Sequence, residues 1–181
     1  MNYLKVSGFE RGIKMKASEF IGKTVIDNDG VEIGKIEDLV IKPEKCLIDR
    51  VIISTGGAIR KDYFSIDESD IANIGDYILL NIDKQAAEVK FGTEDLGKIK
   101  KLEINYNKFI GKTVIAKKGV DAGKVEDLII EPKECLINNV IVKGSTRFKK
   151  KNFTVGEGEI TDIGDYVLIN IEPSDILERI I

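Results

Sequence analysis

Two pairs of adjacent acids are the first candidates for chemistry in this chain of 181 residues, Glu37-Asp38 and Glu126-Asp127. Paired carboxylates act as acid and base in catalysis when both point into one cleft. Neighbouring residues of a strand point to opposite faces of a sheet, so adjacent acids are poorly placed for that work. The apolar alternation around each pair slips by one residue, which predicts a β-bulge at the pair instead.

A second candidate is the turn "DNDG" at residues 27–30, whose acids resemble the start of a calcium loop. That loop pattern needs a further acid at the position of Val25. The corresponding turn later in the chain, at residues 116–119, reads "AKKG" and carries no acid. The spacing therefore favours a plain hairpin turn over a metal site.

Nucleophilic chemistry has little support in the composition. The chain contains no histidine, so it lacks the commonest general base and transition-metal ligand. Its two cysteines, Cys46 and Cys135, are too few for a zinc site without histidine. We interpret them as small buried apolar residues, with a disulfide or a reactive thiol as the alternative. We expect no catalytic residue, no metal and no cofactor, and therefore no enzymatic activity.

Two segments are candidates for contact with a partner. Residues 147–153 combine bases with aromatic rings, as RNA-contacting strands do, although a solvated hairpin with lysines along an exposed strand edge has the same composition. A short helix expected from Pro173 onward carries an apolar stripe, which packs either on its own domain or on a partner. The candidate partner-binding residues are Arg147, Phe148, Lys149, Lys150, Lys151, Phe153, Ile176, Leu177, Ile180 and Ile181.

These candidates lie in a chain that repeats itself with an offset of 89 residues. Residues 20–82 match residues 109–171 without a gap, with 32 identities in 63 positions. Self-similarity of this extent indicates an internal duplication. A residue kept in both copies is needed by the fold or by a function that both copies retain, and the copies close either two separate cores or one shared core.

Each copy has the pattern of a small all-β domain, with about five or six short strands separated by turn signals. The longest strands are expected at residues 33–41 and 122–130, and Pro43 and Pro132 mark the turns that follow them. A few residues after 83 favour a helical turn or two. The expected organisation is an N-terminal arm (1–16), a first barrel (17–83), a linker (84–105), a second barrel (106–172) and a C-terminal helix (173–181).

Charge and hydropathy limit the partners. The 28 basic and 31 acidic residues give a net charge of −3, which argues against nucleic acid as the main partner. Apolar runs are no longer than four residues, against the roughly 20 needed to span a bilayer, and the first residues have no secretory signal pattern. We expect a cytoplasmic protein that meets a membrane only through a partner.

The shared pattern resembles the PRC-barrel domain, a small β-barrel of the photosynthetic reaction centre H subunit and the ribosome maturation factor RimM. The resemblance rests on "FIGKTVI", on the acid pair and the proline after it, and on "IGDY", all present in both copies. It implies two tandem PRC-type β-barrels with a short C-terminal helix. The family pattern contains no catalytic set, so it implies no catalytic residues.

The resemblance also implies a function in protein–protein interaction. A chain built of PRC-barrels alone resembles archaeal cell-division proteins that act with SepF, the membrane anchor of the FtsZ ring. We therefore expect a non-enzymatic adaptor, recruited to the division site, that binds a SepF-type protein or another PRC-barrel protein and forms a homodimer through exposed strand edges. The alternative is an RNA- or ribosome-associated assembly factor of the RimM type, for which the basic run at residues 147–153 is the motivation.

Overall fold

The computed structural model describes residues 12–56, 61–91 and 104–180. The first repeat contains β1 (Met15–Lys16), α1 (Ala17–Phe20), β2 (Thr24–Ile26), β3 (Glu32–Lys42), β4 (Leu47–Gly56), β5 (Lys61–Ile66), β6 (Ile71–Ile74), β7 (Ile78–Leu80) and α2 (Lys84–Phe91). The second contains α4 (Tyr106–Phe109), β8 (Thr113–Ala116), β9 (Val120–Glu131), β10 (Leu136–Gly144), β11 (Asn152–Val155), β12 (Ile160–Ile163), β13 (Val167–Ile169) and α5 (Pro173–Arg179). Short 3-10 helices lie at Pro43–Lys45, Glu68–Asp70, Lys117–Gly119, Pro132–Glu134 and Thr146–Phe148.

The described strands form one sheet whose order is symmetric about its centre, β12-β13-β8-β9-β10-β4-β3-β2-β7-β6. The pair β10–β4 lies at the middle, and the same sequence of strands runs outward from it into each repeat. The pairs β2–β7 and β8–β13 are parallel, whereas the hairpins are antiparallel. The expected all-β fold of two small PRC-type barrels with a short C-terminal helix is confirmed.

The predicted bulges lie at the acid pairs. In β3 the register with β4 shifts between Ile36 and Asp38, and Glu37 is the extra residue. In β9 the register with β10 shifts between Val125 and Asp127 in the same way. The bulge lets a long strand bend sharply, which a small barrel requires.

Close backbone approach explains one glycine of each repeat. A Cβ added to Gly34 would lie 2.1 Å from the carbonyl oxygen of Ser54, and one added to Gly123 would lie 2.0 Å from that of Lys143. No side chain fits there, so both copies need glycine where the bent strand passes its neighbour.

A short helix follows the last strand of each repeat: α2 follows β7, and the C-terminal helix α5 follows β13. Ala87 of α2 and Ile176 of α5 occupy equivalent positions, and both are fully buried. The helix α2 spans residues 84–91, which the sequence analysis assigned to the linker. The two helices therefore belong with the barrels that they follow.

The repeats exchange their N-terminal segments. Met15 and Lys16 of β1, in the predicted N-terminal arm, pair with β9 of the second repeat. Reciprocally, Asn105 forms a bridge to Val40, and the amide of Ile41 donates to the carbonyl oxygen of Ile104 at 2.9 Å. Each barrel is thus completed by a strand segment that precedes the other barrel in the chain.

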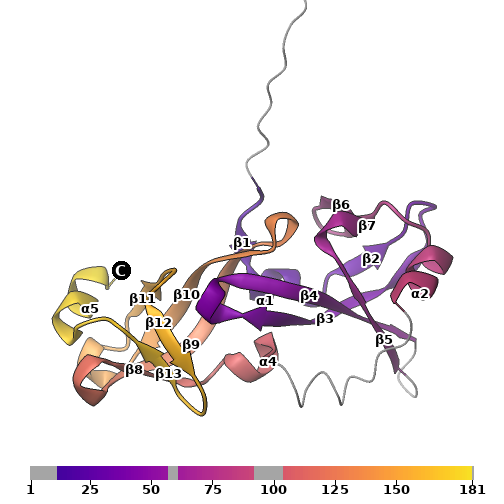
Figure 1. Ribbon diagram of the computed structural model, residues 1–181. Helices are drawn as coiled ribbons and strands as arrows, with labels where there is room; N and C mark the ends of the chain where they lie inside the picture. Colours follow the sequence, from indigo (N-terminus) through magenta and orange to yellow (C-terminus); the bar gives the residue numbers. More distant parts are fainter. Residues whose placement is uncertain (1–11, 57–60, 92–103, 181) are drawn as a thin grey trace, which may run out of the picture.

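The two long hairpins, β3–β4 and β9–β10, also meet at the centre of the molecule (Figure 1). Leu47 lies opposite Leu136. The amide of Ile48 donates to the carbonyl oxygen of Cys135 at 2.9 Å, and the amide of Ile137 donates to the carbonyl oxygen of Cys46 at 2.8 Å. The bonds are related by the repeat offset of 89, so the junction has approximate twofold symmetry.

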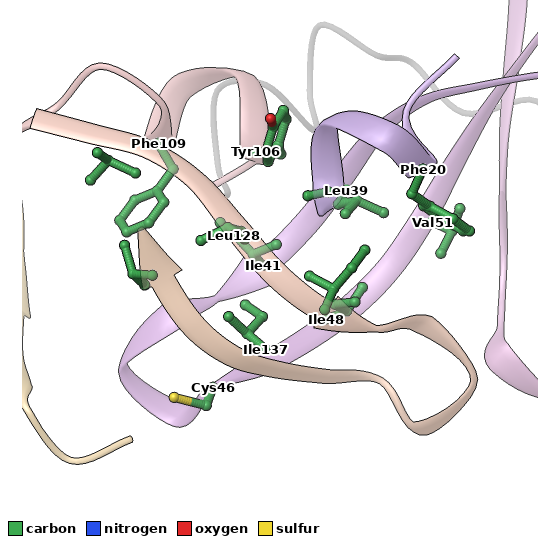
Figure 2. Close-up of a cluster of buried hydrophobic side chains, with 14 of the residues drawn as sticks. Phe20, Leu39, Ile41, Cys46, Ile48, Val51, Tyr106, Phe109, Leu128 and Ile137 are labelled. Atoms are coloured by element: carbon green, nitrogen blue, oxygen red, sulfur yellow. The ribbon is translucent and has the colours of Figure 1, made fainter. Parts of the chain in front are cut away.

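One core runs through both repeats. Figure 2 shows Ile41 and Ile48 of the first repeat packed among Leu128, Ile137 and Phe109 of the second. Phe20 and Phe109, at equivalent positions of α1 and α4, are both fully buried in this cluster. Of the two arrangements left open by the sequence, the structure has the shared core.

Candidate interaction surfaces

The acid pairs act across the junction. The Asp127 carboxylate of the second repeat accepts hydrogen bonds from the amide of Ser18 at 3.2 Å and from its hydroxyl at 2.5 Å. It also accepts from the hydroxyl of Tyr106 at 3.1 Å and from the amide of Leu128 at 2.8 Å. The equivalent Asp38 accepts from the amide of Asn107 at 3.3 Å and from that of Leu39 at 2.9 Å. Each aspartate therefore binds the start of the short helix that the other repeat contributes.

These contacts describe structural carboxylates rather than a catalytic couple. Asp38 and Asp127 are buried, whereas their neighbours Glu37 and Glu126 are more exposed, and Glu126 accepts a hydrogen bond from Asn152. Burial, and then the charge of Asp127, raise the pKa of the Tyr106 hydroxyl, which keeps it protonated as a donor. The sequence predicted the bulge correctly but contained no sign of the contacts between repeats.

Both cysteines are free thiols at the junction. Burial raises the pKa of Cys46, whose sulfur lies 3.6 Å from the carbonyl oxygen of Pro43. Burial, followed by a 3.2 Å hydrogen bond to Glu68, raises the pKa of Cys135 to about 12. The thiolate is the nucleophilic form, so a raised pKa disfavours nucleophilic reaction at both side chains.

The "DNDG" turn is held by its first acid. Asp27 accepts from the amides of Val31 at 2.7 Å, Asp29 at 3.0 Å and Lys84 at 3.0 Å, so it closes the turn and caps α2. The hydrogen bond from Val31 is the main reason why the pKa of Asp27 is lowered. Across residues 12–56, 61–91 and 104–180, no three Cys, Asp or Glu side chains are grouped to hold a metal ion.

The basic-aromatic run divides into two kinds of residue. Phe148 and Phe153 are 1% and 0% exposed, and their ring centroids lie 6.3 Å apart in the core. Their inclusion among the partner-binding residues is therefore wrong, because a core residue cannot contact a partner. The remaining candidates of the run are exposed, and they are Arg147, Lys149, Lys150 and Lys151.

The C-terminal stripe divides in the same way. Ile176 is fully buried and Ile180 packs against the core, so the alternative of a helix packed on its own barrel holds for these two residues. Arg179 fixes the helix, since its guanidinium donates to both carboxylate oxygens of Glu159 at 2.7 and 2.8 Å. Leu177, 55% exposed, is the residue of the stripe that faces solvent, and Ile181 lies outside the described residues.

A third surface was not among the candidates named from the sequence. We call outer face 1 the solvent side of β2 and β7, with Ile26, Tyr77 and Leu79, and outer face 2 the equivalent side of β8 and β13, with Ile115, Tyr166 and Leu168. Parallel pairing places Ile26 opposite Leu79, and Ile115 opposite Leu168. Directly paired residues share a face of the sheet, so each pair forms one apolar patch.

Both outer faces are open to solvent. Tyr77 is 54% and Leu79 39% exposed, and their equivalents Tyr166 and Leu168 are 55% and 40% exposed. The two isoleucines are half-buried. The faces lie on β7 and β13, in different repeats and on opposite sides of the central junction (Figure 1).

Charged residues at the edges of the outer faces are also retained. On outer face 1, Glu32 pairs with Ile26, Lys35 pairs with Thr24, and Asp76 precedes Tyr77. The equivalents on outer face 2 are Asp121, Lys124 and Asp165. Around each apolar patch an acid pairs with the isoleucine and a lysine pairs with the neighbouring threonine. A second retained lysine, Lys23 or Lys112, donates to the carbonyl oxygen of Gly75 or Gly164.

A signal for these faces was present in the sequence. The motif "IGDY" and the strand after it are kept in both copies, and strand alternation places Tyr77 and Leu79 on the side opposite to Ile78 and Leu80. The sequence did not show which side of this strand faces the core. Burial of Ile78 and Leu80 shows that the tyrosine and the leucine are the exposed set.

The molecule is thus a duplicated small β-barrel protein whose repeats share a core. The family model for the PRC-barrel domain matches residues 13–87 and 101–176, which together cover most of the chain. The chain belongs to the PRC-barrel domain family, as its repeated motifs indicated. No curated protein matches the chain. None of the helices within the described residues is long and apolar enough to cross a membrane.

Proposed function

We propose that this protein is a non-catalytic adaptor that joins other proteins through its outer faces. One observation carries the proposal: both repeats keep the same exposed tyrosine and leucine, Tyr77 with Leu79 and Tyr166 with Leu168. Residues buried in the core are explained by stability, whereas retained exposed apolar residues are typical of binding surfaces. Family membership is consistent with this role.

The finer proposal is a role in archaeal cell division. It rests on the resemblance of a chain built only of PRC-barrels to division proteins that act with SepF and the FtsZ ring. In this proposal the protein is cytoplasmic, reaches the division site through a SepF-type protein or another PRC-barrel protein, and meets the membrane only indirectly. A homodimer through strand edges remains part of the proposal, and sedimentation velocity of the purified chain tests it.

Affinity capture from native extract tests the adaptor function. The bait is the full chain, and the matched baits carry Tyr77→Lys with Leu79→Lys, Tyr166→Lys with Leu168→Lys, or all four changes. Leu177→Lys is the control, because it replaces an equally exposed apolar residue on α5.

We expect proteins of the division ring in the eluate of the wild type and their loss with the fourfold variant. Retention by the Leu177→Lys control would show that the loss is specific to the outer faces, whereas loss with Leu177→Lys alone would assign binding to α5 instead. Recovery of the same proteins by all baits, or of none by the wild type, would contradict the proposal.

The alternative function, in RNA or ribosome assembly, has one structural observation in its favour. A hollow of about 490 Å³ in the second repeat is lined by Lys124, Lys143 and Lys150, with Asp121 as the acid among them. The equivalent hollow of the first repeat, of about 870 Å³, has Ser54 where Lys143 stands. It is lined by Lys35 and Lys84 together with Glu32 and Glu37, so an excess of basic residues is found in the hollow of the second repeat. Binding of ribosomal RNA that weakens steeply with salt, and that Lys143→Glu with Lys150→Glu abolishes, would support this function.

A further inference from the structure

Along β7 and β13 the exposed residues are more alike than the buried ones. Ile78 and Leu80 of β7 are buried, and in β13 they are replaced by Val167 and Ile169. The exposed residues that alternate with them, Tyr77 and Leu79, do not change, since tyrosine and leucine occupy both copies. Burial alone tolerates exchange among aliphatic residues of similar volume, as these core positions demonstrate.

Stability therefore does not account for the identical exposed residues. An exposed tyrosine or leucine on a strand contributes little that another β-forming residue would not. Two surfaces that keep the same exposed apolar residues under these conditions are explained by binding of the same ligand. The approximate twofold symmetry of the junction then presents the two surfaces in equivalent environments.

The charges around each patch indicate the chemistry of that ligand. In outer face 1 the apolar pair Ile26–Leu79 is flanked by Glu32 on one side and Asn73 on the other. In outer face 2 the equivalent pair, Ile115–Leu168, is flanked by Asp121 and Asp162. Asp76 and Asp165 are further retained acids. The retained bases Lys35 and Lys124 lie opposite Thr24 and Thr113, away from the apolar pair, and the ammonium groups of Lys23 and Lys112 already donate to the carbonyl oxygens of Gly75 and Gly164. A ligand that carries lysine or arginine beside apolar side chains complements both faces.

We propose that each outer face binds the same apolar, lysine- or arginine-bearing segment of a partner protein, so that one chain holds two copies of that segment. This inference rests on the adaptor function and adds the valency and the chemistry of the partner. A dimeric partner would engage both faces of one chain or link two chains, and either arrangement increases the apparent affinity without new contacts.

The experiment uses a phage-displayed library of random 12-residue peptides, selected on the full chain. The enriched peptides are synthesised and titrated by calorimetry into the wild type, the two single-face variants and the fourfold variant. Circular dichroism confirms that each variant is folded. Leu177→Lys again serves as the control for an exposed apolar residue outside the faces.

We expect enriched peptides that combine apolar residues with lysine or arginine, and a stoichiometry of two per wild-type chain. Each single-face variant is expected to bind one peptide, and the fourfold variant to bind at least about tenfold more weakly. One peptide per wild-type chain, acidic enriched peptides, or binding unchanged in the fourfold variant would overturn the inference.

Two further outcomes separate this inference from the adaptor function. Partners captured from extract that the fourfold variant still binds, and that Lys149→Glu with Lys151→Glu loses, would leave the adaptor function standing and overturn the assignment to the outer faces. Self-association of the wild type that the fourfold variant abolishes would also overturn it, because the occupant would then be a second copy of the chain.

Discussion

The two repeats keep the same outer face but differ in charge over the rest of their surface. Residues 20–82 contain 7 basic and 12 acidic residues, whereas residues 109–171 contain 10 basic and 9 acidic residues. Much of the difference comes from exposed positions such as Lys118 and Lys151, where the first repeat has Asp29 and Asp62. The comparison distinguishes a surface on which the copies were held constant from surfaces on which they were free to diverge.

The junction is the other constant region, and its constancy has a different cause. Asp38 and Asp127 are retained and buried, and each binds the helix start of the opposite repeat. A change there affects folding, whereas a change on an outer face is expected to affect binding. Substitutions in the core, at the junction and on the outer faces test this division.

The shared core gives the largest expected effect. Phe20→Ala or Phe109→Ala removes a fully buried ring, which is expected to reduce the free energy of unfolding by about 3 to 5 kcal/mol. Because the core is continuous, either change destabilises both repeats in one transition. Calorimetry and hydrogen exchange measure this, with Leu177→Ala as a control that changes little. Protection of one repeat while the other unfolds would refute the single core.

The cross-repeat aspartate gives the next effect. Asp127→Ala leaves the buried Tyr106 hydroxyl and the Ser18 donors without their acceptor, so we expect a loss of about 2 to 4 kcal/mol in urea unfolding. The matched control is Glu126→Ala, on the exposed neighbour, with a change of about 0.5 kcal/mol or less. Equal effects of the two substitutions would show that Asp127 does not stabilise the contact between the repeats and that the acid pair only forms the bulge.

The sequence predicted the elements of each repeat because local patterns specify them. The slip of apolar phase at Glu37 and at Glu126 located the bulges, and proline with the turn residues located the hairpins. The exchange between repeats was not predictable from those patterns. Met15 pairs with Ile130 across more than a hundred residues, and a local pattern does not specify the partner of a strand edge.

The candidate surface was predicted less well, for a physical reason. Phe148 and Phe153 stand among lysines, and the short chain segment that turns Phe148 inward uses left-handed backbone at Lys149 and Lys150, with φ of 56° and 57°. Such a turn is uncommon for residues other than glycine, asparagine and aspartate, so composition alone did not reveal it. The buried side of the run could therefore be identified only from the three-dimensional fold.

The ion pair of α5 gives a smaller effect that depends on pH. The hydrogen bond from Arg179 is the main cause of the lowered pKa of Glu159. A lowered pKa in the folded state stabilises the protein above the unfolded pKa of the carboxyl, and this contribution is lost as the pH falls through the folded value. Arg179→Gln is expected to cost about 1 kcal/mol or less at pH 7, because the pair is partly exposed, and almost nothing in strong acid.

Urea unfolding of the Arg179→Gln variant and the wild type at neutral and acidic pH measures this difference. Glu178→Gln is the control, because Glu178 is the exposed residue directly before Arg179. A penalty for Arg179→Gln that stays constant with pH would indicate that the arginine acts through its packing and not through its charge.

The smallest effect on stability is expected at the outer faces, and it completes the comparison. Tyr77→Lys with Leu79→Lys changes exposed positions, so the free energy of unfolding should fall by less than about 1 kcal/mol. Ile78→Lys, between them, places a charge in the core and should unfold the protein. If the exposed pair proved as costly as the buried residue, its retention in both repeats would follow from folding, and the reason to seek a ligand there would disappear.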